Sequence, residues 1–395
     1  MCAKERTTRT MRVLFLPIPA IGHAYPMVPL AWALRAAGHE VLFGTALGGL
    51  AVEKAGLPVV EVELGQDRPE ALAKSAEKLA EKDPALHAKL RERGDAGLDS
   101  LEEAVPFFAE RSAEFTDVLV DLARAWRPDL VVHSSLYGGA LVAAAVLGVP
   151  SVECREGFGR SERLSVLMYQ HMKEVFADYG ATGLPERRAG TDSCPPSMID
   201  GPRDGWPMRH VPYSGGAQLP AWLMPPIATP SRPRIGVTLG SGSDAWRLEL
   251  AASILASAAG LDVELVLALG DVDPDALGAI PPNARVFGWV PLSALVPTCT
   301  ALIHHGGGGT TLTALEAGVP QLVLATGADN GINARAVHNR GVGISARIEE
   351  VDTALLHRLV TDDAMRSAAG QVRTEISAMP TPAEVVPRLV SLCEP

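Results

Sequence analysis

The sequence lacks the features of a membrane protein, of a disulfide-stabilised scaffold and of a nucleic-acid-binding protein. No run of about 18 apolar residues is present, and residues 1–10 are polar and charged where a signal peptide would have an apolar core. The five cysteines are scattered without a CxxC spacing, which argues against a disulfide framework and against a zinc site. A net charge of -11 argues against a nucleic-acid backbone as a partner. We therefore expect no membrane span, no zinc site, no nucleic acid and cytoplasmic residence.

The composition is that of a folded protein long enough for two domains. Hydrophobic residues make up 47% of the 395 residues and charged residues 21%, a globular balance. In the first half, an apolar strand at residues 12–17 precedes a loop that carries His23, a helix at 27–37 and a second strand at 40–44. Strand, helix and strand in this order predict a parallel sheet, and residues 130–133, 138–147 and 151–154 repeat the pattern.

The second half shows the same alternation after a stretch dense in proline, glycine and tryptophan. Further strands are expected at residues 234–239, 263–269, 284–286, 301–303 and 321–325. The predicted fold class is α/β, with two Rossmann-like doubly wound domains that face a cleft. We expect an N-terminal domain over residues 11–215, a linker over 216–233, a C-terminal domain over 234–378, and a helix within 379–395 that packs back on the first domain.

The most informative stretch follows the expected strand at residues 301–303. Two histidines, His304 and His305, precede four consecutive glycines and a helical pattern at residues 312–317. A strand, a glycine-rich turn and a helix start form an anion site, because main-chain N–H groups converge there and the helix dipole favours negative charge. A histidine at such a turn adds a donor for a phosphate oxygen. This stretch therefore predicts a diphosphate-bearing ligand.

Together with other runs, this stretch resembles the nucleotide-sugar signature of GT-B glycosyltransferases. The runs are residues 287–291 (FGWVP), 328–330 (ADN), Gly22-His23 and 127–132 (RPDLVV). The likeness is closest to the bacterial branch that decorates antibiotics and other natural products, and it covers most of the chain in order and spacing. The resemblance implies an inverting, metal-independent enzyme without a cofactor, in which an acceptor oxygen attacks the anomeric carbon of a nucleotide sugar and a nucleoside diphosphate leaves. The implied partners are a nucleotide sugar and a hydrophobic aglycone such as an aromatic polyketide.

The resemblance also implies roles for individual residues on the donor side. Counting back from Pro320 places His305, rather than His304, at the position of the family's phosphate-contacting histidine. His304 would point to the opposite side of the strand and is interpreted as structural. The remaining donor-site candidates are, for the diphosphate, Gly307, Gly308, Gly309, Thr310, Ser241, Gly242 and Ser243; for the nucleoside, Trp289 and Val290; and for the sugar hydroxyls, Asp329 and Asn330.

His23 is the candidate general base, since an imidazole with a pKa near neutrality can take the acceptor's proton. The family often supports this histidine with an aspartate shortly after the strand that ends near Val132. Here Ser134 stands at that position. Three interpretations stay open: another carboxylate orients His23, the acceptor is an acidic phenol, or His23 acts without a partner.

Thr313 bears on the identity of the nucleotide. Plant relatives have at this position a glutamate that grips both ribose hydroxyls. A deoxyribose has no 2′-hydroxyl, so a threonine favours a dTDP-sugar over a UDP-sugar as the donor, and Thr313 joins the nucleoside-binding candidates.

Two other function classes compete with a deoxysugar transferase. An NAD(P)-dependent oxidoreductase would need a GxGxxG turn after the first strand, but that loop has only Gly22. A non-catalytic nucleotide-sugar-binding helper subunit would be compatible with the missing aspartate near Ser134. The sequence leaves open the acceptor, the exact sugar, O- or C-linkage, a homodimer and an auxiliary activator protein.

Overall fold

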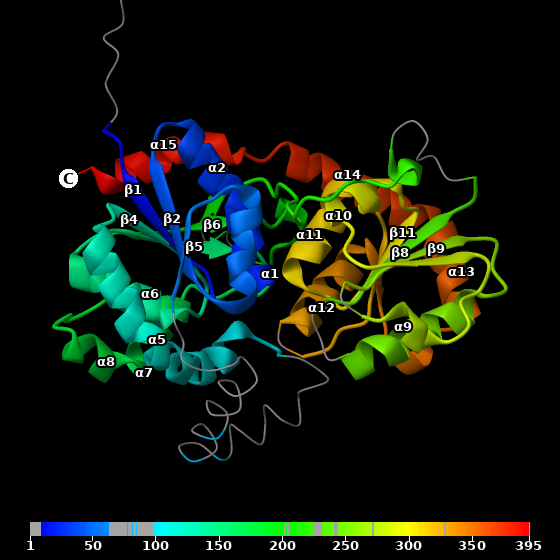
Figure 1. Ribbon diagram of the computed structural model, residues 1–395, viewed down its shortest axis with the longest axis horizontal. Coiled ribbons are helices and arrows are strands. Elements are labelled where there is room, and N and C mark those ends of the chain that lie inside the picture. The colour runs from blue at the N-terminus through cyan, green and yellow to red at the C-terminus, as the bar shows by residue number, and fades with distance from the viewer. Residues whose placement is uncertain are drawn as a thin grey trace, which may run out of the picture.

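The strands of the protein form two separate parallel sheets, one in each half of the chain (Figure 1). The computed structural model describes residues 9–62, 77, 81, 84, 98–200, 203, 205–224, 231–240, 244–270, 272–327 and 329–394. In this part of the chain no helix is both long and apolar enough to cross a membrane. The charge and periodicity of residues 68–127 predict a largely helical stretch; its part up to residue 97 lies almost wholly outside the described residues.

Both sheets have the doubly wound strand order. The first has the order β3-β2-β1-β4-β5-β6-β7 and the second the order β10-β9-β8-β11-β12-β13, and each sheet starts at its centre and winds outward in both directions. The first sheet is made of β1 (Arg12–Leu16), β2 (Glu40–Thr45), β3 (Val59–Glu61), β4 (Leu130–Ser134), β5 (Ser151–Arg155), β6 (Arg188–Asp192) and β7 (Trp206–Pro207). The second is made of β8 (Arg234–Thr238), β9 (Glu264–Ala268), β10 (Ala284–Phe287), β11 (Ala301–His304), β12 (Gln321–Val323) and β13 (Gly343–Ser345). The predicted fold class is confirmed.

Helices cover both faces of each sheet. They are α1 (Ile21–Ala24), α2 (Val28–Ala36), α5 (Val105–Trp126), α6 (Gly138–Leu147), α7 (Leu164–His171), α8 (Lys173–Asp178), α9 (Asp244–Ala258), α10 (Leu292–Leu295), α11 (Gly308–Ala317), α12 (Asn330–Arg340), α13 (Thr353–Thr361), α14 (Asp363–Ser377) and α15 (Pro382–Cys393). In the first domain, α5, α6 and α7 pack on one face, while α2 and α15 pack on the other. In the second, α9 and α13 cover one face, while α11, α12 and α14 cover the other.

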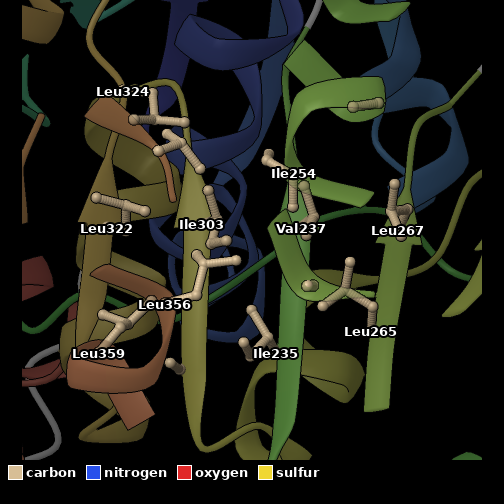
Figure 2. Close-up of a cluster of buried hydrophobic side chains, with 14 of the residues drawn as sticks. Ile235, Val237, Ile254, Leu265, Leu267, Ile303, Leu322, Leu324, Leu356 and Leu359 are labelled. Atoms are coloured by element: carbon tan, nitrogen blue, oxygen red, sulfur yellow. The ribbon is translucent and has the colours of Figure 1, made fainter. Parts of the chain in front are cut away.

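Burial on both faces explains the near-continuous apolar strands. Every residue of β4 and of β11 is buried, as expected for central parallel strands. Figure 2 shows this core in the second domain, where Ile235, Val237 and Ile303 from the strands meet Leu356 and Leu359 of α13.

A Gly-Val-Pro sequence returns the chain from a helix to the next strand in both domains. Gly148 ends α6 with a φ of 66°, and Gly318 ends α11 with a φ of 71°. Only glycine adopts this left-handed conformation at little cost, and the proline two residues later cannot continue a helix. The motif therefore connects each helix to the strand that pairs with the preceding strand, β5 beside β4 and β12 beside β11.

Two helices begin earlier than the sequence pattern predicts. His23 lies in the short helix α1 rather than in a loop, and α1 leads within a few residues into α2. The helix after the glycines starts at Gly308, with Gly307 as its N-cap, so only Gly306 and Gly307 form the turn. Glycine is a poor helix former in isolation, but packing of the helix against the sheet overrides this propensity.

The two domains share a hydrophobic cluster, and the C-terminal helix of the chain packs on the first domain. Phe158 and Cys194 of the first domain pack with Leu312 and Val337 of the second. Helix α15 runs back over the first domain, where Leu389 is fully buried among residues of β1 and α2 (Figure 1). The predicted domain limits near residues 215 and 233 stay a prediction.

Candidate functional site

The His23 turn and the glycine turn after β11 lie where the two sheets reverse their strand order. In the first sheet this point lies between β1 and β4, and in the second between β8 and β11. The His23 turn follows β1 and Ser134 ends β4, while Gly240 follows β8 and the glycine turn follows β11. Ligands of open α/β sheets bind at such crossings, beyond the carboxyl ends of the strands.

The His305 imidazole lies between two glycines. A Cβ atom added to Gly240 or to Gly307 would stand 2.7 Å from His305 Nε2 in either case, closer than real side chains approach. Glycine at both positions therefore makes room for the ring. The Nδ1 atom of His305 is buried and has no hydrogen-bond partner among the described residues. Burial lowers the pKa of His305, against the opposing effects of the Asp329 charge and the Thr238 backbone, which favours the neutral ring at pH 7.

His304 has a different environment from its neighbour. The two rings are perpendicular, with centroids 6.5 Å apart. His304 is fully buried, its Nδ1 accepts a hydrogen bond from the Gly306 backbone N–H at 3.0 Å, and its Nε2 contacts Gln321 Oε1 at 2.8 Å. Burial lowers its pKa to about 3. These contacts confirm the structural interpretation of His304.

The N-terminus of α11 faces the first domain. Gly307 provides no side-chain cap, so the N–H groups of Gly308, Gly309 and half-buried Thr310 are the unpaired donors of the first turn. A Cβ on Gly308 would overlap the Glu156 backbone oxygen, and a Cβ on Gly309 would stand 3.9 Å from Pro26. The predicted diphosphate donors thus lie directly across from the His23 turn.

Asn333 connects the glycine turn to Asp329 and Asn330, the residues predicted to contact the sugar hydroxyls. Its Nδ2 donates to the Gly306 oxygen at 2.8 Å and to Asp329 Oδ2 at 3.1 Å. Its Oδ1 accepts from the Phe158 backbone N–H of the other domain at 3.0 Å. Asp329 is the N-cap of α12, and Asn330, its first residue, donates to the Thr326 oxygen at 2.7 Å. Asn333 therefore holds three parts of the site in one arrangement.

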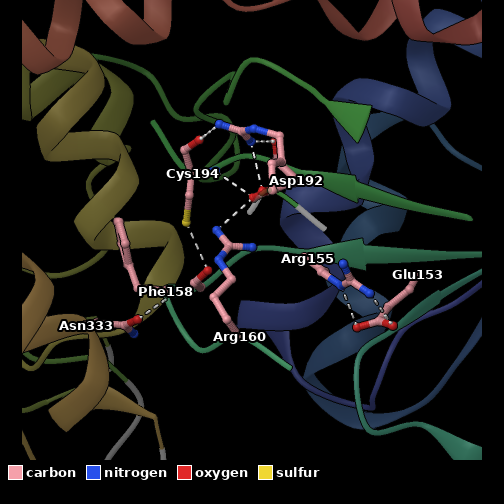
Figure 3. A network of polar contacts seen from close by, with 9 residues as sticks. Glu153, Arg155, Phe158, Arg160, Asp192, Cys194 and Asn333 are labelled. Atoms are coloured by element: carbon pink, nitrogen blue, oxygen red, sulfur yellow. Dashed lines mark hydrogen bonds and ion pairs between the residues drawn. The ribbon is translucent and has the colours of Figure 1, made fainter. Parts of the chain in front are cut away.

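A buried ionic network in the first domain lies beside the hydrogen bond between Phe158 and Asn333 (Figure 3). Arg160 Nη2 pairs with Asp192 Oδ1 at 2.9 Å, and Arg203 Nη1 pairs with Asp192 Oδ2 at 2.8 Å. The Cys194 backbone N–H donates to the same carboxylate, and its thiol donates to the Gly157 oxygen at 3.0 Å. The network holds the loop after β5 against the segment after β6, so the residues that reach the second domain are firmly placed.

His23 is exposed in α1, and Ser134 anchors the segment that leads to it. The Ser134 hydroxyl is buried and accepts a hydrogen bond from the Ile18 backbone N–H at 3.2 Å. The serine thus contacts the main chain five residues before His23. The role of His23 as general base stays a prediction.

Trp289 links the second domain to the first through an aromatic chain. Its side chain is 52% exposed, its indole N–H donates to the Ser214 oxygen at 3.1 Å, and its ring meets Tyr25 edge-on with centroids 6.5 Å apart. Tyr25 in turn meets Tyr213 at 4.7 Å. Val290 is buried beside Leu295. The indole edge is thus held by the segment at Ser214, and about half of the side chain stays exposed.

Thr313 is buried and makes two hydrogen bonds. Its hydroxyl donates to the Gly309 oxygen at 2.7 Å, so its oxygen accepts from His210 Nε2 at 3.3 Å. Burial lowers the pKa of His210 to about 4, which keeps this ring neutral. A contact of Thr313 with a nucleoside stays a prediction, as does any contact of Ser241, Gly242 or Ser243, which lie outside the described residues.

Asn333, His210 and Glu156 were not among the predicted site residues. Their contacts join segments far apart in the sequence, such as the 103 residues between His210 and Thr313, and no local pattern marks them. Within the described residues, no group of three or more histidine, cysteine, aspartate or glutamate side chains is placed to hold a metal ion.

Comparison with known proteins agrees with this geometry. The N-terminal domain model of the erythromycin biosynthesis protein CIII-like family matches residues 32–240, and its C-terminal domain model matches residues 252–392. The chain is 40% identical over 387 residues to the elloramycin glycosyltransferase ElmGT of Streptomyces olivaceus, covering 96% of this chain and 97% of that protein.

Two solved structures share the whole architecture. The glycosyltransferase SnogD from Streptomyces nogalater has a TM-score of 0.82 and 37% identity, over 98% of this chain and 100% of that one. The glycosyltransferase SsfS6 of Streptomyces sp. SF2575, in complex with thymidine diphosphate, has a TM-score of 0.78 and 30% identity, over 96% and 99% of the two chains. With two doubly wound sheets, a glycine turn facing the first domain and relatives matched over nearly the full length, the chain belongs to the erythromycin biosynthesis protein CIII-like family and is a natural-product glycosyltransferase of the GT-B fold.

Proposed function

We propose that the protein moves a deoxysugar from a dTDP-sugar to a hydrophobic natural-product aglycone, such as an aromatic polyketide, with inversion at the anomeric carbon and without a metal ion. The observation that carries this proposal is the position of His305 and the α11 N-terminus across from the His23 turn. The thymidine diphosphate bound by SsfS6 supports a thymidine nucleotide as the donor.

In this reaction an acceptor oxygen forms a bond to the anomeric carbon while the bond to the β-phosphate oxygen breaks. The acceptor proton passes to His23, and the diphosphate leaves with increased negative charge. The N–H groups of Gly308, Gly309 and Thr310, together with the neutral His305 ring, donate hydrogen bonds to that charge. Fixed donors in this arrangement take the place of a divalent cation.

Substitution of His23 tests the chemical step separately from donor binding. We expect His23→Ala to bind dTDP with the affinity of the unchanged protein and to lose turnover about 100-fold or more, because the proton acceptor is removed. His171→Ala, at an exposed position in α7, is the matched control. Calorimetric titration and turnover on a panel of aromatic polyketide aglycones give the two readouts. Undiminished turnover of His23→Ala would remove this residue from the mechanism.

The same assay separates the remaining alternatives. Turnover in excess EDTA and the anomeric configuration of the product, read by NMR, test metal independence and inversion. Binding of dTDP without turnover of any aglycone would favour a helper subunit. A tighter complex with UDP than with dTDP would contradict the choice of donor.

A further inference from the structure

Glu156 is a carboxyl group that the proposed reaction does not use, although it stands where the two domains meet. It directly follows β5 at the carboxyl edge of the first sheet. Its backbone oxygen occupies the space that a Cβ on Gly308 would need. Gly308 is the first residue of α11, so Glu156 abuts the helix N-terminus that we assign to the diphosphate.

The segment that carries Glu156 also lies next to Asp329, which is predicted to contact sugar hydroxyls. A Cβ on Gly157 would stand 3.1 Å from Asp329 Oδ2, and the next residue, Phe158, is hydrogen-bonded to Asn333. The charges of Glu156 and Asp329 act on each other. Glu156 therefore lies between the glycine turn and the group expected to contact sugar hydroxyls.

The Glu156 carboxyl is short of hydrogen-bond partners. Its Oε1 atom is buried and has no partner among the described residues. The groups that act on the carboxyl are the Cys154 thiol, which donates a hydrogen bond to it, and the Asp329 carboxylate, itself close enough to act on His305. Burial raises the pKa of Glu156 well above its ordinary value, and the charge of Asp329 adds to this, while the hydrogen bond from Cys154 opposes it. These effects favour the neutral form of the carboxyl.

We propose that Glu156 is a further donor-sugar contact, contributed by the N-terminal domain, and that its carboxyl group donates a hydrogen bond to an oxygen of the deoxysugar. A protonated carboxyl has one O–H donor as well as acceptor capacity. A carboxylate would be repelled by a diphosphate and by Asp329, whereas a neutral acid is not. This inference rests on the proposed function for its ligand and makes closure of the two domains part of sugar recognition.

The test compares two ligands that differ only in the sugar. Calorimetric titrations at pH 7 use dTDP and, as the probe for a dTDP-deoxysugar, dTDP-L-rhamnose. We expect Glu156→Ala to bind dTDP-L-rhamnose about tenfold more weakly and dTDP within about twofold of the unchanged protein, since one hydrogen bond to the sugar is lost. Glu156→Gln keeps a neutral donor and acceptor, and it should restore the affinity for the sugar nucleotide. Glu174→Ala, at an exposed position in α8, is the control.

Infrared spectroscopy measures the protonation of the Glu156 carboxyl directly, which loss of a purely structural contact would not report. The unchanged protein should show the band of a protonated carboxyl at pH 7, and Glu156→Gln should lose it. Equal sugar-nucleotide affinities in the unchanged protein and Glu156→Ala, weak binding by Glu156→Gln, or no lost band would each overturn the role of Glu156. Failure of the unchanged protein to bind dTDP would instead overturn the proposed function.

Discussion

Two adjacent histidines in this protein have opposite relations to the fold. His304 uses both ring nitrogens within the core. The buried Nδ1 atom of His305 makes no hydrogen bond of good geometry within the described part of the chain. The alternation of side chains along a strand sends them to opposite sides. A one-residue difference in position therefore separates a histidine that is bonded within the sheet from one that lies beside the glycine turn.

The buried neutral histidines make the stability of the protein sensitive to acid. The pKa is lowered to about 3 for His304 and to about 4 for His210, while in the unfolded chain both stay near the ordinary value of about 6.5. The unfolded state therefore binds more protons below pH 6.5, and stability falls as the pH is lowered. Between pH 7 and pH 5 each ring should cost about 2 kcal/mol.

Urea denaturation across this pH range measures the effect. His304→Gln, which does not titrate, should lose less stability between pH 7 and pH 5 than the unchanged protein. His357→Gln, at an exposed position in α13, is the control and should behave like the unchanged protein. An identical pH dependence in His304→Gln would show that this ring is not held neutral.

Helix α11 begins with Gly308, whose lack of a side chain leaves room for the loop after β5. The sequence pattern predicts a helix beginning at residue 312, but the helix begins at Gly308, where the loop after β5 approaches closely. Local propensity disfavours glycine in a helix, so this early start cannot be read from the residues themselves. The approach of Glu156 supplies the reason for glycine at this position.

Alanine substitution separates the effect of the close approach between Gly308 and Glu156 from the effect of helix propensity. Gly308→Ala should destabilise the protein by about 1–3 kcal/mol, because the new methyl group meets main-chain atoms that cannot rotate away. Gly370→Ala in α14, where no atom lies within 4 Å of the added Cβ, should instead stabilise it by about 0.5–1 kcal/mol. Thermal denaturation of both variants provides the measurement. Equal responses would mean that the domains do not approach at Gly308.

The molecule is assembled so that each half depends on the other. Phe158 of the first domain completes a hydrophobic cluster of the second, and α15 at the end of the chain completes the core of the first. Deletion of buried methyl groups from α15 should therefore loosen the core of the first domain.

Leu389→Ala tests the docking of α15. Leu389 is fully buried with β1 and α2, and its truncation should destabilise the protein by about 2–5 kcal/mol and speed hydrogen exchange in α2. Leu359→Ala in α13 removes a similarly buried side chain from the core of the second domain. It should lower stability by a comparable amount but leave exchange in α2 unchanged. Faster exchange in sheet β8–β13 alone after Leu389→Ala would contradict this assignment.

Periodicity and turn chemistry were sufficient to predict the α/β class and most of the central strands. The reason is that buried parallel strands are continuously apolar and that Gly-Val-Pro ends a helix through local steric effects. The resemblance of residues 301–320 to a known signature predicted a nucleotide-sugar enzyme, and family membership agrees with it.

Contacts between distant segments depended on the folded chain. The Asn333 bridge to Phe158 spans 175 residues, the His210–Thr313 bond spans 103, and Glu156 meets Gly308 from another domain. None of these pairs has a local sequence signal, because hydrogen bonds and close packing across a domain contact depend on where two surfaces meet. The amino-acid pattern thus accounts for the α/β class and for most of the central strands, whereas the contacts of Asn333, His210 and Glu156 arise only when distant segments of the folded chain meet.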